Sequence, residues 1–209
     1  MKPKKIIILL FILSLVFYNG CKKDLVGPEY FDSDVYSYLP LKIGNYWEYE
    51  YTDIALRAIV KREIKNKVTH EDGSIIFGYY EGLVSSNPNP IEPVNGYYSD
   101  KDNAIYYYSS SKDTMVISGT TILTQKTPIL KMPLSIGAYW IVASDTFKIE
   151  SFSSINIDEK IYNQTILVVT RNNISIDSTW FSKEIGIVRR KVFNSNSFVE
   201  MKLKSYSLN

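Results

Sequence analysis

The chain has 209 residues, with 24 Lys and Arg against 22 Asp and Glu. Three of the basic residues lie within the first five positions, so the rest of the chain carries 21 basic and 22 acidic side chains, with no electrostatic signature of a nucleic-acid binder. A single cysteine excludes an internal disulfide, and 17 Tyr with 3 Trp favour β structure.

The first twenty residues predict an export signal peptide. Lys2, Lys4 and Lys5 form a positive start, and an apolar run follows at 6–18. This run of about 13 residues is too short for a membrane span, which needs ~20. We therefore expect residues 1–20 to be removed from the mature protein.

The only cysteine follows directly after this segment. Gly20 and Cys21 resemble the lipobox of bacterial lipoproteins, where a small residue before Cys permits cleavage by signal peptidase II and the thiol carries diacylglycerol. Tyr18 and Asn19 differ from the usual Leu and Ala or Ser, and looser boxes of this kind are similar to those of the Bacteroidota. The resemblance implies signal cleavage between Gly20 and Cys21 and a lipid attached at Cys21, with palmitate among its acyl chains. A secreted protein with an incidental cysteine is the alternative.

The residues after Cys21 bear on where the anchor lies. In lipoprotein sorting, Asp in the next position is similar to an inner-membrane retention signal, whereas this chain has Lys22. The resemblance thus implies the outer membrane, with the periplasmic or surface face left open. Residues 21–38 contain Gly-Pro and Asp-Ser-Asp without clean periodicity, so we expect an acylated N-terminus and flexible tether there.

Two nearly matching phrases organise the rest of the chain, Leu39-Pro-Leu-Lys-Ile-Gly-Asn-Tyr-Trp47 and Met132-Pro-Leu-Ser-Ile-Gly-Ala-Tyr-Trp140. Proline suits the position before a ladder begins, and glycine permits a bend or a positive φ. We interpret each phrase as the entry to the first strand of one of two similar halves, 39–131 and 132–209, within a single domain 39–209. Trp47 and Trp140 then either fill the core at the strand starts or act as ligand-stacking platforms.

Short alternating segments separated by turn residues follow both phrases. They predict an all-β fold, a curved antiparallel sheet in the form of a half-barrel, open barrel or sandwich, with no helix beyond the signal peptide. The expected strands are 45–53, 57–69, 75–84, 96–99, 103–109, 114–118, 120–126, 138–143, 145–154, 162–171, 174–182, 185–193 and 197–207.

Three stretches carry a family resemblance: the first phrase, Trp180-Phe-Ser-Lys-Glu-Ile-Gly-Ile-Val-Arg189, and Leu203-Lys-Ser-Tyr206. They resemble a broad group of bacterial lipoproteins of unknown function with F/L-P-L-x-x-G-N-x-W early and G-x-G-x-V late. Glu184-Ile-Gly186 stands here in place of the more usual Gly-Val-Gly. The resemblance implies a curved antiparallel sheet similar to the half-barrels of lipoprotein carriers, and it brings no catalytic residue with it.

Residues able to carry chemistry are sparse. The single histidine, His70, lies beside a predicted Asp-Gly turn, and the pairs Asp100/Asp102 and Asp158/Glu159 also fall in predicted turns. Turn carboxylates are usually solvated, and neither pair has the spacing of a calcium loop. We predict no catalytic residue, no metal site and no cofactor, and thus not an enzyme.

Clustered tyrosines are the remaining feature, and we single out Tyr79, Tyr98 and Tyr107. They either cover sheet surface or a partner interface, or they present exposed rings to a surface glycan. The leading hypothesis is a lipid-anchored, non-enzymatic envelope module that binds an envelope protein or component. The alternatives are a carrier of a lipid or other hydrophobic ligand in the concave face, and surface glycan binding.

Overall fold

The computed structural model describes residues 34–54, 56–69, 75–84, 94–101, 103–108, 115–117, 120–122 and 126–209. This part of the chain forms one short 3-10 helix, η1 (Val35–Tyr38), and otherwise β-strands. The strands are β1 (Tyr46–Thr52), β2 (Arg57–Thr69), β3 (Ile75–Leu83), β4 (Val94–Lys101), β5 (Ala104–Tyr108), β6 (Met115–Ile117), β7 (Thr120–Ile122), β8 (Lys126–Lys131), β9 (Tyr139–Val142), β10 (Asp145–Ile157), β11 (Lys160–Arg171), β12 (Ser175–Ser182), β13 (Gly186–Asn194) and β14 (Ser197–Ser207).

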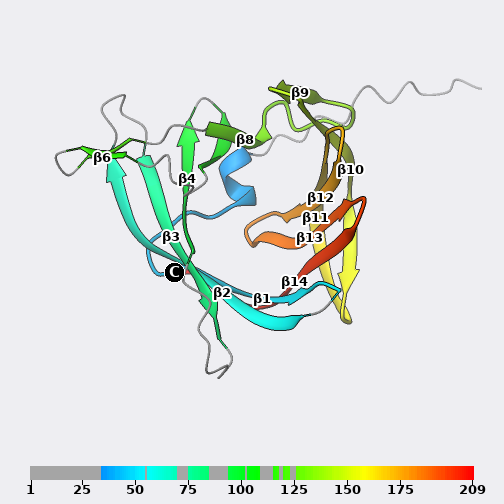
Figure 1. Ribbon diagram of the computed structural model, residues 1–209, viewed down its shortest axis with the longest axis horizontal. Helices are drawn as coiled ribbons and strands as arrows, with labels where there is room; N and C mark the ends of the chain where they lie inside the picture. The colour runs from blue at the N-terminus through cyan, green and yellow to red at the C-terminus, as the bar shows by residue number, and fades with distance from the viewer. Residues whose placement is uncertain are drawn as a thin grey trace, which may run out of the picture.

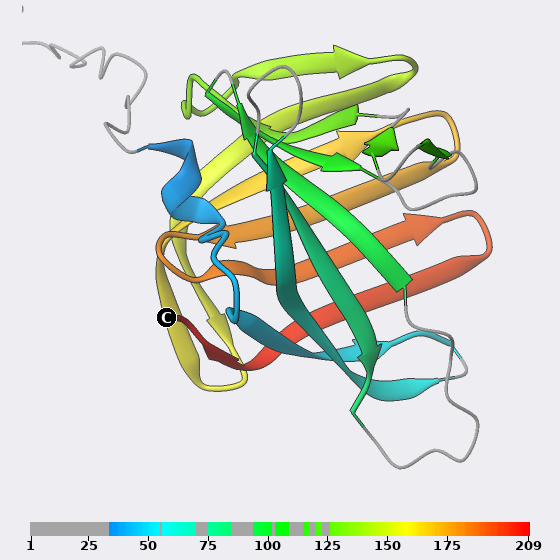
Figure 2. The same cartoon turned by 90° about the vertical axis from the view of Figure 1, so that its left-hand side faces the viewer.

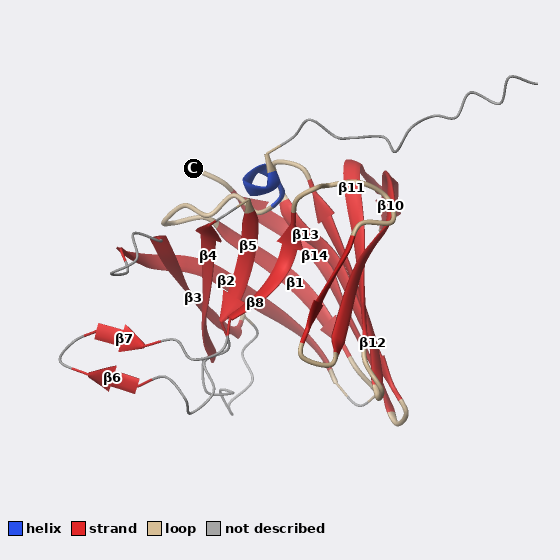
Figure 3. Ribbon diagram, turned by 90° about the horizontal axis from the view of Figure 1, so that it is seen from above, coloured by secondary structure: helices blue, strands red, loops and turns tan. Residues whose placement is uncertain are grey.

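Twelve strands form one antiparallel sheet in the order β8-β5-β4-β3-β2-β1-β14-β13-β12-β11-β10-β9. The sheet curves around an interior and is not closed, with β8 and β9 as its two edges (Figures 1 and 2). β6 and β7 pair separately, and Figure 3 shows their hairpin set apart from the large sheet. The predicted all-β class with a curved antiparallel sheet is therefore confirmed.

The large sheet consists of two similar halves, as predicted. The first half contains β1 to β5 and β8, and the second contains β9 to β14. Within each half, neighbouring strands of the sheet follow one another along the chain, apart from the small β6–β7 hairpin. The halves join where β1 pairs with β14, from Tyr46↔Ser207 to Thr52↔Glu200.

The two repeated phrases adopt the same local structure. Gly44 and Gly137 both have φ of 89°, which glycine adopts without a Cβ penalty. In the first phrase, the Gly44 amide donates to Ile64 across the hairpin, and in the second the Gly137 amide donates to Ile149, at 2.9 and 2.8 Å. The glycine thus turns the chain into the first strand of each half.

Alternation along the strands decides which side chains face the interior. Ile64 in β2 and Leu203 in β14 are buried, whereas their strand neighbours Lys65 and Lys204 are exposed. The buried side chains form one core that draws on both halves.

Helix η1 corrects the predicted extent of the tether. Val35 and Tyr38 are fully buried, and η1 contacts both β5 and β13, so it lies across the interior between the two halves (Figure 1). The Glu184 amide donates to the Ser37 carbonyl at 2.6 Å. Residues 35–38 therefore belong to the folded domain, because their apolar side chains close one end of the curved sheet.

The segment after residue 122 also differs from expectation. The strand expected at 120–126 is instead the short β7 and a separate β8, which contains Pro128. Proline is compatible with an edge strand because the N–H it lacks has no ladder partner there. β8 pairs with β5 on one side only, with Tyr106 opposite Pro128.

The predicted signal peptide 1–20, the cleavage pair Gly20 and Cys21, and the tether up to residue 33 lie outside the described residues, as does His70. Within the described ranges, no helix has the length and apolar character needed to cross a membrane.

Candidate ligand-binding pocket

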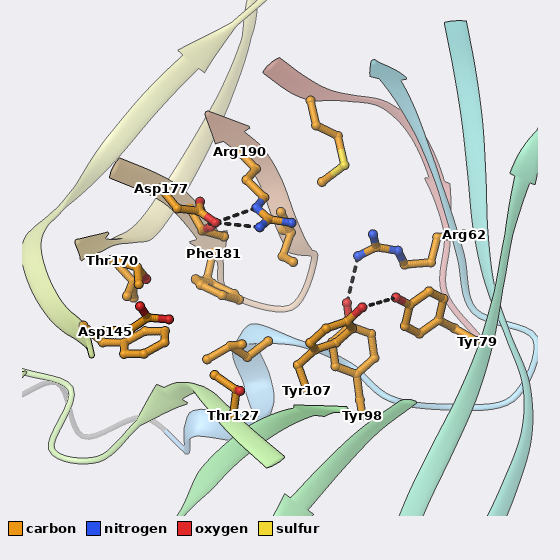
Figure 4. Close-up of a pocket in the computed structure, with 16 residues that line it drawn as sticks. Arg62, Tyr79, Tyr98, Tyr107, Thr127, Asp145, Thr170, Asp177, Phe181 and Arg190 are labelled. Carbon is orange, nitrogen blue, oxygen red and sulfur yellow. Dashed lines mark hydrogen bonds and ion pairs between the residues drawn. The ribbon is translucent and has the colours of Figure 1, made fainter. Parts of the chain in front are cut away.

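A cavity of about 320 Å³ remains inside the curved sheet, and strands of both halves line it (Figure 4). The first half contributes from β2, β3, β4, β5 and β8, and the second from β10 to β14. The lining residues are Arg62, Tyr79, Tyr98, Tyr107, Thr127, Ile129, Asp145, Phe147, Val168, Thr170, Asp177, Thr179, Phe181, Ile187, Arg190 and Met201.

The period of two along each strand puts these side chains on the concave face. In β12, Asp177, Thr179 and Phe181 line the cavity, and the intervening Ser178 and Trp180 do not. The inward face of β12 thus carries two polar residues, Asp177 and Thr179, beside the core residue Phe181.

A buried arginine and three tyrosines form the polar wall of the first half. Arg62 donates from Nη1 to the Tyr98 hydroxyl at 2.8 Å, and its guanidinium lies 4.8 Å from the centre of the Tyr79 ring. The Tyr79 hydroxyl donates to that of Tyr107 at 3.3 Å, and the Tyr79 and Tyr98 rings stack at 5.1 Å. Four consecutive strands of the sheet, β2 to β5, thus bring one guanidinium and three hydroxyls together.

Arg62 is charged despite its burial. Its side chain is 10% exposed, and its Nε donates to Glu81 Oε2 at 2.6 Å, with Nη2 forming an ion pair to the same carboxylate. Burial lowers the pKa of Arg62, but Tyr98 and Glu81 raise it by more. Burial also raises the pKa of Tyr79 and Tyr98, so both hydroxyls are protonated beside the cation.

A second arginine faces the cavity from the other half. Arg190 in β13 donates from Nε and Nη2 to Asp177 Oδ2 in β12, at 2.9 and 2.6 Å. The other oxygen of Asp177 accepts from the Thr179 hydroxyl at 3.1 Å. The Arg190 side chain is 46% exposed, and Figure 4 shows its guanidinium directed toward the side of the pocket that holds Arg62.

The remaining polar groups lie near the edges of the sheet. Asp145 in β10 makes no ion pair or side-chain hydrogen bond with any described residue. Thr127 in β8 and Thr170 in β11 add hydroxyls to the same cavity. Apolar side chains complete the wall, namely Ile129, Phe147, Val168, Phe181, Ile187 and Met201.

Trp47 and Trp140 pack into the core, so neither offers a free ring face to a ligand. Trp47 is 1% exposed, and its Nε1 donates to the Ile185 carbonyl at 2.6 Å. Trp140 stacks on Phe147 with ring centres 5.4 Å apart, and its Nε1 donates to the Pro128 carbonyl at 2.8 Å. Of the two roles left open for these residues, the geometry fits core filling.

The three singled-out tyrosines lie together, but not where a surface glycan could stack on them. Tyr79 and Tyr98 are 4% and 3% exposed and face the concave interior beside Tyr107. The expectation of exposed rings is therefore wrong for these two, because the inner face of the curved sheet covers them. The concave face also carries charged side chains, whereas a carrier of a wholly apolar lipid would need an apolar face.

The charged residues of the pocket were not among the predicted site residues. One signal was present: Arg62 interrupts the apolar face formed by Ala58, Val60 and Ile64 in an otherwise regular alternation. Arg190 and Asp177 had no such signal, since their meeting depends on the pairing of β12 with β13.

Other candidate acids do not form a site. Asp158 lies in the β10–β11 turn and pairs with Lys204 at 3.0 Å, which lowers its pKa. Among the described residues, no group of three His, Cys, Asp or Glu side chains is arranged to hold a metal ion.

No protein-family model and no curated protein matches this sequence. Solved structures align with this chain, among them the following two. A proposed exported protein of Bacteroides fragilis with a YmcC-like fold aligns with a TM-score of 0.52 and 8% identity, over 80% of this chain and 97% of that chain. A proposed lipoprotein of Parabacteroides distasonis aligns with a TM-score of 0.47 and 10% identity, over 81% of this chain and 98% of that chain. At this identity, the first likeness shows that this chain has the fold described as YmcC-like.

Proposed function

We propose that this chain is a lipid-anchored protein of the bacterial cell envelope that binds a small amphiphilic ligand inside its curved sheet and catalyses no reaction. The cavity carries the proposal. It combines apolar side chains with a few charged and hydroxyl groups, and its volume of about 320 Å³ falls in the range of ~300–1,000 Å³ that is usual for small-molecule sites.

The mixed lining is the reason to propose an amphiphile rather than a wholly apolar lipid. Burying a polar group without a hydrogen bond costs about 1–3 kcal/mol, so Arg62 and Asp145 disfavour a ligand that offers them no polar atom. Phe147, Phe181 and Met201 gain from covering an apolar surface.

Ligand binding is tested with N-phenyl-1-naphthylamine, a neutral apolar probe that fluoresces when buried. Thr179→Trp places an indole into the cavity, whereas Ser178→Trp changes the adjacent residue, which faces away from it. We expect the probe to bind the unmodified chain and Ser178→Trp alike, and Thr179→Trp at least about tenfold more weakly. Equal binding to all three, with folding checked by circular dichroism, would place the probe elsewhere and refute the pocket.

A natural ligand is sought by native mass spectrometry of residues 22–209, exported behind a signal peptide that signal peptidase I removes and purified without detergent from an envelope-containing bacterial host. A discrete added mass that organic extraction removes is the expected result. Thr179→Trp should lose that mass and Ser178→Trp should keep it. An added mass that both variants retain would argue against the cavity as its site.

The anchor rests on the positive start, the short apolar run and Gly20-Cys21 in the sequence. The description of the Bacteroides fragilis protein as exported is in line with an envelope location. Lys22 after the cysteine supports the outer membrane. Labelled palmitate should be incorporated into the unmodified chain and not into Cys21→Ser, and labelling of the variant would show that Cys21 is not the attachment site.

A further inference from the structure

We propose that the pocket prefers anionic amphiphiles, and that an acidic group of the ligand binds between the guanidinium groups of Arg62 and Arg190. This inference rests on the proposed ligand-binding function and adds the chemical class of the ligand. It concerns a carboxylate, sulfonate or phosphate oxygen at the arginine end, with the apolar part of the ligand against Phe147 and Phe181.

Unused hydrogen-bond donors are the first argument. A guanidinium has five N–H donors and no acceptor. Arg62 directs Nε and Nη2 to Glu81 and one Nη1 donor to Tyr98, and Arg190 directs Nε and Nη2 to Asp177. Two N–H groups on Arg62 and three on Arg190 therefore make no bond to a protein side chain that the structure describes.

The neighbouring hydroxyls add donors rather than acceptors. Tyr98 accepts from Arg62 and Tyr107 accepts from Tyr79, so each can donate its own proton onward. The ligand that satisfies a cluster of N–H and O–H donors is one with several acceptor oxygens on a single group, and an oxyanion gives the strongest such bonds.

The distribution of charge around the cavity is the second argument. Glu81, which balances Arg62, is not among the lining residues, so at this position the cavity meets the cation and not its partner. Burial and, to a smaller extent, the charge of nearby Arg62 lower the pKa of Arg190, whereas Asp177 raises it, and the net direction is upward. Asp177 also lines the cavity, but it occupies only Nε and one Nη2 donor of Arg190, so an anion placed between the two guanidinium groups is attracted by the donors that remain.

Asp145 gives the opposite end of the pocket a different character. It is the one lining carboxylate without a side-chain partner among the described residues, and Thr127 and Thr170 also line the pocket. These groups suit a hydroxyl or N–H of the ligand, so the acidic group belongs at the arginine end.

The test compares two probes that differ by one sulfonate, 1-anilinonaphthalene-8-sulfonate and N-phenyl-1-naphthylamine. The variant is Arg190→Gln combined with Asp177→Asn, which removes the ion pair and leaves the net charge unchanged. Arg189→Gln combined with Glu200→Gln is the matched control, because Arg189 forms the corresponding pair with Glu200 without lining the cavity.

We expect the preference for the sulfonate probe over the neutral probe to fall about tenfold in the cavity variant, as for loss of a charge-assisted hydrogen bond, and to be unchanged in the control. Decanoate should likewise displace the neutral probe at about tenfold lower concentration than decanol. Suppose that both probes bind in the cavity, but that the double variant changes neither the preference for the sulfonate probe nor the preference for decanoate over decanol. The anion site is then refuted and the ligand pocket stands. If neither probe distinguishes Thr179→Trp from Ser178→Trp, the proposed function itself fails.

Discussion

Trp47 and Trp140 hold matching places in the two repeated phrases, but their indoles bond to different parts of the sheet. Trp47 reaches the carbonyl of Ile185, in the turn between β12 and β13, and so ties the start of the first half to the second half. It is also among the largest side chains that are fully buried. Its contribution to stability therefore combines packing with one buried hydrogen bond.

Trp47→Phe should lower the free energy of unfolding by about 2–4 kcal/mol, because it leaves a small cavity and an unpaired carbonyl at Ile185. Trp180→Phe is the control, since Trp180 is only half-buried and contacts Arg189 through its ring at 5.5 Å, and it should cost about 1 kcal/mol or less. Urea unfolding measures both. Equal losses would mean that the indole of Trp47 contributes no more than a partly exposed one.

The ion pairs of Glu50 make the stability of the fold depend on pH. Its carboxylate is buried in β1, forms an ion pair with Arg57, and pairs with Lys204 at 3.1 Å. The hydrogen bond from Arg57 is the main cause that lowers its pKa below 4.5. A carboxyl group whose pKa is lower in the folded than in the unfolded protein stabilises the fold at pH values above its unfolded pKa, ~4.3. This stabilisation is lost as the pH falls through the folded pKa.

Glu50→Gln should therefore lower stability at pH 7 by about 1 kcal/mol and flatten the loss of stability below about pH 5. Glu159→Gln, at an exposed turn position, should leave the loss of stability below about pH 5 unchanged. Thermal unfolding from pH 7 to pH 3 is the measurement. If the melting temperature falls with pH in parallel for the unmodified chain and Glu50→Gln, this ion pair does not cause the loss of stability in acid.

The turn before β13 is fitted closely to the start of β1. Gly186 has φ of 108°, and a Cβ there would lie 3.1 Å from Trp47 Nε1 and 3.3 Å from Leu39 Cδ1. Gly137 has a positive φ as well, but nothing lies within 4 Å of its Cβ position. Substituting each glycine by alanine therefore distinguishes the cost of backbone strain, present at both positions, from the cost of steric crowding, present only at Gly186.

Gly137→Ala should cost about 1–2 kcal/mol from backbone strain alone, and Gly186→Ala should cost more because it also displaces Trp47 or Leu39. Thermal unfolding compares them. A smaller loss for Gly186→Ala than for Gly137→Ala would mean that the β12–β13 turn moves freely away from Trp47.

Strands with a long, regular alternation could be predicted from the sequence, and strands at the margins of the sheet could not. β2 was expected at 57–69 and has those bounds, because Ala58, Val60 and Ile64 alternate with mostly charged residues, even though Arg62 lies on their face. β8 was missed because Pro128 argues against a strand unless its neighbours are known. η1 was missed because four residues are too few for a helical period to show.

The pocket could not be predicted from the sequence for a related reason. Tyr79, Tyr98 and Tyr107 were singled out from the sequence, and they lie together in the structure, but the direction in which they face depends on the curvature of the sheet. Arg190 and Asp177 are neighbours only through the register of β12 with β13. Local patterns identify strand faces, whereas a site built from ten strands depends on their order.

The two halves meet differently at their two junctions. β1 and β14 share a regular antiparallel ladder with one register shift. β8 and β9 share no ladder, and Trp140 Nε1 to Pro128 O is the hydrogen bond that joins them among the described residues. One junction is thus held by backbone pairing, and the other by a side chain.

Trp140→Phe should therefore loosen the molecule at one place. We expect amide hydrogen exchange in β8 and β9 to become about tenfold faster, with little change in β1 and β14, because one buried hydrogen bond is lost at the weaker junction. Trp180→Phe serves again as control and should not change exchange in β8. A uniform acceleration throughout the sheet would indicate global destabilisation instead.

The strand order makes these two junctions symmetry equivalents. If β1 is matched to β9 and β8 to β14, an approximate two-fold operation carries the β1–β14 pair onto the β9–β8 pair. Two separate copies of such a six-stranded unit could satisfy both junctions at once and form a barrel without edges. In this single chain no ladder joins β8 to β9, beside the cavity residues Thr127 and Phe147, so on this side the cavity lacks a continuous hydrogen-bonded wall.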